Sequence, residues 1–141
     1  MGGLADQPVL DSDVLIDYLR GAGPGRELVD ALAGTLAFFL TAVSAFELAL
    51  GRSFAADPEP ALALLAAPAL PLTHGAGLRA GELARELGRA GRALEVRDAM
   101  QAGICLEAGA PLVTRNARHF ERVTELEIAS PQEWLARLSG A

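Results

Sequence analysis

The chain has 141 residues, of which 51% are hydrophobic and 21% charged, enough for a single domain (residues 1–141) with a buried core and unlike a disordered chain. Its one cysteine, Cys105, excludes an intrachain disulfide framework, no Cys/His cluster has zinc spacing, and we expect Cys105 to lie in the core. Met1–Gln7 lacks the basic region of a secretory signal, so the expected location is cytoplasmic.

The net charge of −6 argues at first against a nucleic-acid partner, because phosphate binding favours a basic surface. The charge is unevenly placed, however, with eight arginines against six acidic residues between Arg79 and Arg122. Some of the remaining negative charge could belong to a site that a divalent metal neutralises. All twelve cationic residues are arginine, which excludes a mechanism that requires lysine.

Apolar runs and helical periodicity alternate along the chain. The first half is predicted to contain a strand at Pro8–Leu10, helices at Val14–Leu19 and Pro24–Leu32, a strand at Leu36–Val43, and helices at Ser44–Arg52 and Asp57–Ala67. The second half is predicted to contain a strand at Leu70–Thr73, helices at Ala76–Ala90 and Val96–Ala108, a strand at Pro111–Thr114, a turn at Asn116–Phe120, an edge strand at Leu126–Ile128 and a helix at Pro131–Leu138. This alternation predicts an α/β fold with a parallel sheet covered by helices on both faces.

The segment Leu36–Phe46 is apolar enough to be compared with a membrane span. A spanning helix needs about 20 apolar residues, and this segment is much shorter. We therefore expect a buried strand that runs into a helix.

Several polar residues are expected at the carboxyl ends of the strands, where open α/β sheets place their reactive groups. Asp11 follows the first strand, Glu47 is expected in the first turn of the helix after the second strand, and Asn116 follows the strand that ends at Thr114. Asp98 opens a helix whose small residues allow close packing. Carboxylates gathered by a fold repel one another unless a cation compensates, and oxygen ligands of this kind suit Mg²⁺.

Each acid also has a purely structural interpretation. Asp11 or Ser12 could cap the first helix, and Ser44 and Glu47 have the spacing of a capping box. Asp98 is favoured near a helix start by the helix dipole alone. Residue by residue, these interpretations stay open.

Taken together, four segments carry a more specific signal: Val9–Gly21 (VLDSDVLIDYLRG), Thr41–Gly51 (TAVSAFELALG), Gly91–Gly103 (GRALEVRDAMQAG) and Ala110–Phe120 (APLVTRNARHF). In this order they resemble the motifs of the PIN-domain family, and within it the VapC-type toxins of toxin–antitoxin pairs. The resemblance covers nearly the whole chain. It implies a three-layer α/β/α sandwich with a central parallel sheet of four to five strands.

The resemblance implies a metal-dependent ribonuclease in which Asp11, Glu47 and Asp98 hold Mg²⁺, or Mn²⁺ in its place. Asn116 and Thr114 would orient water or the scissile phosphate. It also implies a cognate antitoxin, a homodimer and an RNA substrate.

Other residues of the four segments either support the expected site or differ from the pattern of the family. Asp13 is expected to supply an oxygen in the outer part of the metal site, and Ser12 is expected to make a supporting contact. Asp17 is expected to lie at the surface. The family often has an acid where this chain has Asn116, which leaves open whether the site binds one metal ion or two. Gln101 stands where an apolar residue is usual.

Arg115 and Arg118 flank Asn116 and are candidates for contacts with the RNA backbone, or else belong to a solvated face. Gly75–Ala80 fits a loose dinucleotide-binding fingerprint, but a flexible loop before a helix accounts for it better. The Asp11-x-Asp13 pattern also suggests an aspartyl-phosphate phosphatase, which would need the lysine that this chain lacks. The functional alternatives are a free-standing PIN nuclease in RNA processing and a catalytically inactive PIN-like module that binds proteins.

Overall fold

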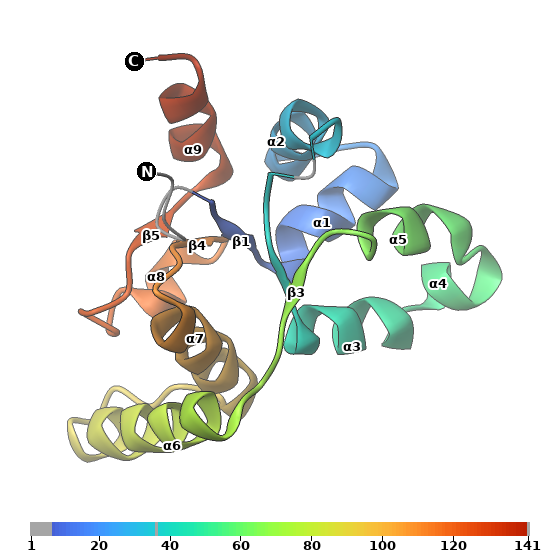
Figure 1. Cartoon of the computed structure of the whole chain (residues 1–141). Coiled ribbons are helices and arrows are strands. Elements are labelled where there is room, and N and C mark those ends of the chain that lie inside the picture. Colours follow the sequence, from blue (N-terminus) through green and yellow to red (C-terminus); the bar gives the residue numbers. More distant parts are fainter. Residues whose placement is uncertain (1–6, 36, 141) are drawn as a thin grey trace.

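The computed structural model describes residues 7–35 and 37–140 (Figure 1). Every strand pairing within them is parallel, as predicted. The strands are β1 (Val9–Leu10), β2 (Leu40–Thr41), β3 (Ala69–Leu70), β4 (Leu112–Val113) and β5 (Ile128–Ala129). They are shorter than the predicted strands, and Leu36, where the second one was expected to begin, lies outside the described residues.

The strands form a three-stranded sheet in the order β1-β4-β5 and a two-stranded sheet of β2 and β3. A single parallel bridge between Val9 and Phe39 joins the two, where Leu10 N donates to the carbonyl of Phe39 over 3.0 Å. The spatial order of the strands is therefore β3-β2-β1-β4-β5. The four-to-five-stranded parallel sheet implied by the family resemblance is confirmed.

Helices connect the strands and cover the sheet. In chain order they are α1 (Ser12–Arg20), α2 (Pro24–Ala33), α3 (Ala42–Leu50), α4 (Arg52–Ala56), α5 (Glu59–Leu64), α6 (His74–Arg89), α7 (Val96–Ala108), α8 (Ala117–Phe120) and α9 (Pro131–Leu138). The bounds of α7 and α9 match the predicted helices. None of the helices within the described residues has both the length and the apolar character that crossing a bilayer requires.

Two of the helices begin earlier than predicted because a threonine caps them. The side chain of Thr41 accepts the backbone N–H of Ser44, so α3 starts at Ala42. The side chain of Thr73 accepts the N–H of Ala76, so α6 starts at His74. The glycine-containing fingerprint at residues 75–80 is therefore helical, and the prediction of a flexible loop there was wrong.

Alternate residues of the strands face two separate cores, as the twofold period of a strand requires. Leu10 and Val113 pack with α1, α2, α3, α5 and α9 on one face of the sheet. Val9 and Leu112 pack with α6, α7 and α8 on the other, together with the buried Cys105. The domain thus has the three layers of an α/β/α sandwich, and Cys105 is part of the core as predicted (Figure 1).

Candidate active site

Asp11 lies at the carboxyl end of β1 and is the N-cap of α1, where its Oδ1 accepts the backbone N–H of Ser12 over 2.9 Å. Only 2% of the residue is exposed. The same oxygen accepts the side-chain amide of Gln101 over 3.1 Å, and Oδ2 lies 2.8 Å from the hydroxyl of Thr114. The carboxylate is therefore held in one orientation by groups from three elements.

Glu47 lies in the second turn of α3, not the first, because the helix starts at Ala42. The predicted capping box with Ser44 does not form, since Thr41 caps the helix instead. Glu47 does not turn back to the start of its own helix. It extends toward α1, where its Oε1 accepts a hydrogen bond from the hydroxyl of Ser12 over 2.9 Å.

Asp98 lies in the first turn of α7, as predicted, and is 7% exposed. Its Oδ2 is 3.6 Å from Nδ1 of His119, which belongs to α8 and had not been assigned to the site from the sequence. The other oxygen faces Arg97.

Arg97 is the residue that connects the three acids. Its Nη2 donates to Oδ1 of Asp11, to Oε1 of Glu47 over 2.6 Å and to the hydroxyl of Ser12 over 3.0 Å. Its Nε also donates to Oε1 of Glu47 over 2.9 Å, and its Nη1 donates to Oδ1 of Asp98 over 3.0 Å. The fold thus brings Asp11, Glu47 and Asp98 around a single cationic group, and that group belongs to the chain itself.

The electrostatics of this cluster show tight pairing. Burial disfavours the charge of Arg97, but its hydrogen bonds to Glu47 and Asp11 outweigh burial and raise the pKa of Arg97 above its usual range. Burial, and then the charge of Asp11, raise the pKa of Asp13 to about 6. Three carboxylates pair with the single guanidinium of Arg97, so the formal negative charge of these side chains exceeds the positive charge beside them.

Asp13 and Thr114 form the neighbouring part of the site. The hydroxyl of Thr114, which is fully buried, lies 3.3 Å from Oδ2 of Asp13 as well as close to Asp11. The backbone N–H of Arg115 donates to both carboxylate oxygens of Asp13, over 3.3 and 3.2 Å. Thr114 thus contacts carboxylates and not solvent. The backbone N–H of Asn116 donates to Thr114 over 3.1 Å, while Asn116 itself is exposed at the start of α8.

Gln101 is a site residue whose role the sequence analysis missed. It is completely buried, and besides Asp11 it donates to the hydroxyl of Ser44 over 3.0 Å and accepts the hydroxyl of Thr41 over 2.6 Å. It therefore ties Asp11 on α1 to the start of α3. The signal was present, because a polar residue three positions after Asp98 lies on nearly the same face of the helix.

The prediction that Asp17 lies at the surface was wrong. It is 4% exposed, and its carboxylate accepts the N–H of Gly25 over 2.9 Å and Nη1 of Arg115 over 2.7 Å. Arg115 is thus paired with Asp17 in this structure, whereas Arg118 is exposed on α8.

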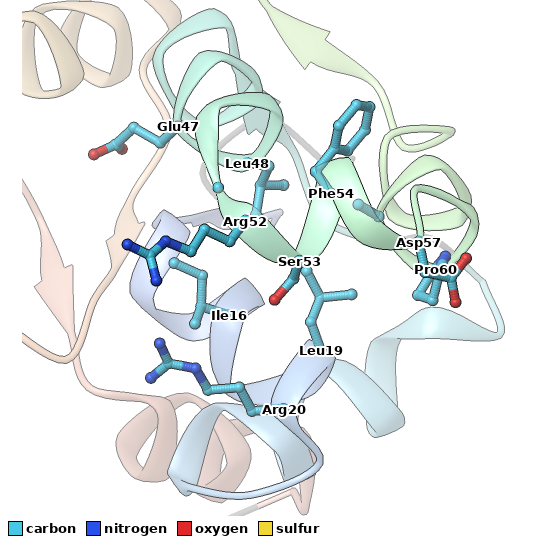
Figure 2. A pocket seen from close by; sticks show the side chains of 12 residues that line it. Ile16, Leu19, Arg20, Glu47, Leu48, Arg52, Ser53, Phe54, Asp57 and Pro60 are labelled. Carbon is cyan, nitrogen blue, oxygen red and sulfur yellow. The ribbon is translucent and has the colours of Figure 1, made fainter.

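A cavity of about 410 Å³ borders the site at Glu47, between α1, α3, α4 and α5 (Figure 2). Its lining includes the apolar side chains of Leu19 and Leu48. Arg20 and Arg52 line it as well, and Figure 2 shows their guanidinium groups on the side of the cavity to which Glu47 also extends. Sequence reasoning missed both arginines, because helices far apart in the chain bring them together.

The residue types at the site fit a hard divalent cation, because they offer carboxylate oxygens and an excess of negative charge. Their present positions do not yet form a coordination shell. Within residues 7–35 and 37–140, no three Asp, Glu, His or Cys side chains are close enough to share one ion. The guanidinium of Arg97 instead hydrogen-bonds to one oxygen of each of the three acids.

The fold and the site together define an α/β/α domain with an acidic cluster at the carboxyl ends of a parallel sheet. A sequence model of the PIN domain matches residues 9–126, a range that contains all three acids and Asn116. The chain therefore belongs to the PIN-domain family.

Chains of similar fold are found among solved structures, one of them in a toxin–antitoxin complex from Klebsiella pneumoniae. A chain of DNA-bound VapBC from Salmonella typhimurium is similar with a TM-score of 0.72 and 24% identity, covering 89% of this chain and 98% of that chain. A chain of VapBC-1 from nontypeable Haemophilus influenzae is similar with a TM-score of 0.70 and 19% identity, covering 88% of this chain and 97% of that chain. A chain of FitAcB from Neisseria gonorrhoeae is similar with a TM-score of 0.70 and 15% identity, covering 89% of this chain and 99% of that chain. A search of curated proteins finds no match to the sequence.

Proposed function

We propose that this protein is a metal-dependent endoribonuclease that acts as the toxin of a VapBC-type toxin–antitoxin pair. The observation that carries the proposal is that Asp11, Glu47 and Asp98, in a PIN domain, all pair with the one guanidinium group of Arg97. The three acids are 36 and 51 residues apart along the chain, so only a specific fold assembles them.

In this proposal Asp11, Glu47 and Asp98 hold Mg²⁺, or Mn²⁺ in its place. A divalent metal held by these residues would supply activation of a water molecule and stabilisation of charge on the phosphoryl oxygens. Gln101 and Thr114 keep the Asp11 carboxylate in place, since both hydrogen-bond to it. Asn116 and Arg118, exposed beside the site, contact the RNA, and Arg20 and Arg52 extend the cationic surface along the cavity.

The proposed partners follow from the similar structures. The similar structures from Salmonella typhimurium and Haemophilus influenzae are named VapBC and VapBC-1, the former is bound to DNA, and the similar structure from Klebsiella pneumoniae is a toxin–antitoxin complex. We propose that this chain likewise pairs with a cognate antitoxin, forms a homodimer and acts in the cytoplasm.

One observation favours a second candidate, a catalytically inactive PIN-like module that binds proteins. Arg97 already pairs with all three acids, and the fourth motif has the neutral Asn116. A domain whose acids were permanently neutralised in this way would bind no metal.

The test is cleavage of structured RNA by protein freed of any partner, with Mg²⁺, with Mn²⁺ and with EDTA. Cleavage should require the metal. Asp11→Asn should lower the rate about a hundredfold or more, because it removes a charged metal ligand worth several kcal/mol. The matched control is Asp30→Asn, which changes an exposed aspartate on α2 and should cleave like the wild type.

If the purified protein cleaves no RNA with any divalent metal, the nuclease proposal is wrong and the binding module replaces it. If cleavage occurs but no antitoxin gene adjoins this one, the protein is a free-standing RNA-processing nuclease and not a toxin.

A further inference from the structure

Arg97 occupies one oxygen of each of the three carboxylates that the proposed function assigns to a divalent metal. Oδ1 of Asp11 and Oε1 of Glu47 both accept hydrogen bonds from its Nη2, and Oδ1 of Asp98 accepts one from its Nη1. A metal ion bound to these oxygens would therefore lie where the guanidinium lies. The two cations cannot share the position, both for lack of space and because like charges at such short distance repel.

The position of Arg97 in the chain allows the guanidinium to leave. Arg97 is the second residue of α7, its side chain is 27% exposed, and its neighbour Val96 is 69% exposed. The guanidinium is carried on a long aliphatic stem and is partly exposed, while Asp98, the next residue, is buried. A change in the side-chain torsions of Arg97 is therefore the movement by which the guanidinium would leave, and it would require no change in the helix.

We propose that Arg97 is a built-in competitor of the metal: it neutralises the acids while the site is metal-free, and metal binds only when its guanidinium is displaced. This inference rests on the proposed function, because it presupposes that the acids can hold a metal. It explains why the three acids, as they stand, are spread around a planar group and form no common coordination shell.

Competition implies opposite effects on metal affinity and on metal-free stability. Arg97→Gln removes the competing charge, so the Kd for Mn²⁺ measured by calorimetry should fall about tenfold or more, the equivalent of losing one charge-assisted hydrogen bond. In EDTA the same variant should melt at a lower temperature than the wild type, because Asp11, Glu47 and Asp98 lose the arginine with which all three pair. With saturating Mn²⁺ that deficit should disappear.

Arg85→Gln is the matched control, since Arg85 is an exposed arginine on α6 away from the site. It should leave both the Mn²⁺ affinity and the melting temperatures in EDTA and Mn²⁺ as in the wild type.

Displacement can also be observed directly. The Nε–H NMR signal of Arg97, assigned by its loss in Arg97→Gln, should shift on saturation with Mg²⁺, because its hydrogen bond to Glu47 breaks. A signal that stays unchanged in the Mg²⁺-saturated protein would overturn the inference.

The outcomes separate this inference from the proposed function. If the wild type binds Mn²⁺ and Arg97→Gln binds it no more tightly, the competition is refuted while the nuclease proposal stands. If neither protein binds Mn²⁺, both are refuted.

Discussion

Asp11 shows that a structural role and a site role are compatible in one side chain. It caps α1, as the structural interpretation predicted, and it also accepts hydrogen bonds from Gln101 and Arg97. For Glu47 the two roles were exclusive. A capping glutamate turns back to its own helix, whereas this one extends to Ser12 and Arg97.

Asp13 gives a pH dependence whose sign can be worked out. Its pKa rises to about 6 in the folded protein from a usual value of 3.8, first through burial and then through the charge of Asp11. Between these two pH values, folding is therefore accompanied by uptake of a proton at Asp13. The contribution of this proton uptake to the stability of the folded protein is lost as the pH rises from about 4 to about 6.

We expect Asp13→Asn to melt about 3 °C higher than the wild type at pH 7.5 without metal, because the amide avoids the buried charge. The difference should shrink toward zero below pH 4, where Asp13 is protonated. Melting curves of both proteins across this range, with Asp30→Asn as an exposed control, measure it. A constant difference at every pH would contradict the assigned cause.

At the scale of elements, helix starts were the least predictable feature. The sequence offers both Thr41 and Ser44 as caps for α3. Thr41 caps because it ends β2 with extended backbone (φ −128°, ψ 163°), which points its hydroxyl at the N–H of Ser44. That choice depends on strand pairing, so no local pattern reveals it.

The contact of α6 with α7 depends on Gly103 (Figure 1). A Cβ added at this position would lie 2.5 Å from the backbone carbonyl oxygen of Ala76 and 3.1 Å from the Cβ of Ala80. The small residues of α7 were predicted to allow close packing. At Gly103 that close packing is between two helices.

Gly103→Ala should lower the free energy of unfolding by about 1–3 kcal/mol, because backbone atoms of α6 must move to make room. Urea denaturation measures the change. The control is Gly81→Ala within α6, where an added Cβ meets nothing within 4 Å, and it should stabilise the protein by about 0.5–1 kcal/mol. Equal stability of Gly103→Ala and wild type would show that the helices separate easily.

At the scale of the whole molecule, the described surface leaves large apolar side chains in contact with solvent. Phe46 is 65% and Leu50 72% exposed, and they lie one turn apart on the same side of α3. Single exposed apolar residues are common on protein surfaces. Phe46 and Leu50 form an adjacent exposed pair beside the candidate active site, and we infer that this pair contacts the second copy of the chain in the proposed homodimer.

If α3 forms the dimer contact, Leu50→Glu should convert the dimer to monomer at micromolar concentration, because it places a charge in an apolar interface. Analytical ultracentrifugation of wild type and variant measures this. Leu78→Glu, on α6 and 61% exposed in the wild type, should leave the dimer intact. A wild type that is monomeric at these concentrations would exclude the homodimer, and dissociation by both variants would exclude α3 as its specific site.

Local patterns in the sequence determined the order of the strands and of the helices other than α4, the bounds of α7 and α9, the family motifs and the acids expected at the strand ends. These features were predictable because periodicity, caps and turn residues act over a few neighbouring positions.

Only the tertiary structure decided the partners of these residues. Arg97 meets Asp11 across 86 positions and Glu47 across 50, Gln101 meets Thr41 across 60, and Asp17 is buried by Gly25 and Arg115. Arg97 and Asp98 are adjacent in the sequence, yet one pairs with three acids and the other is one of those acids. The side chains that neutralise a buried charge are chosen by which elements pack together, and that choice is made by the folded chain as a whole.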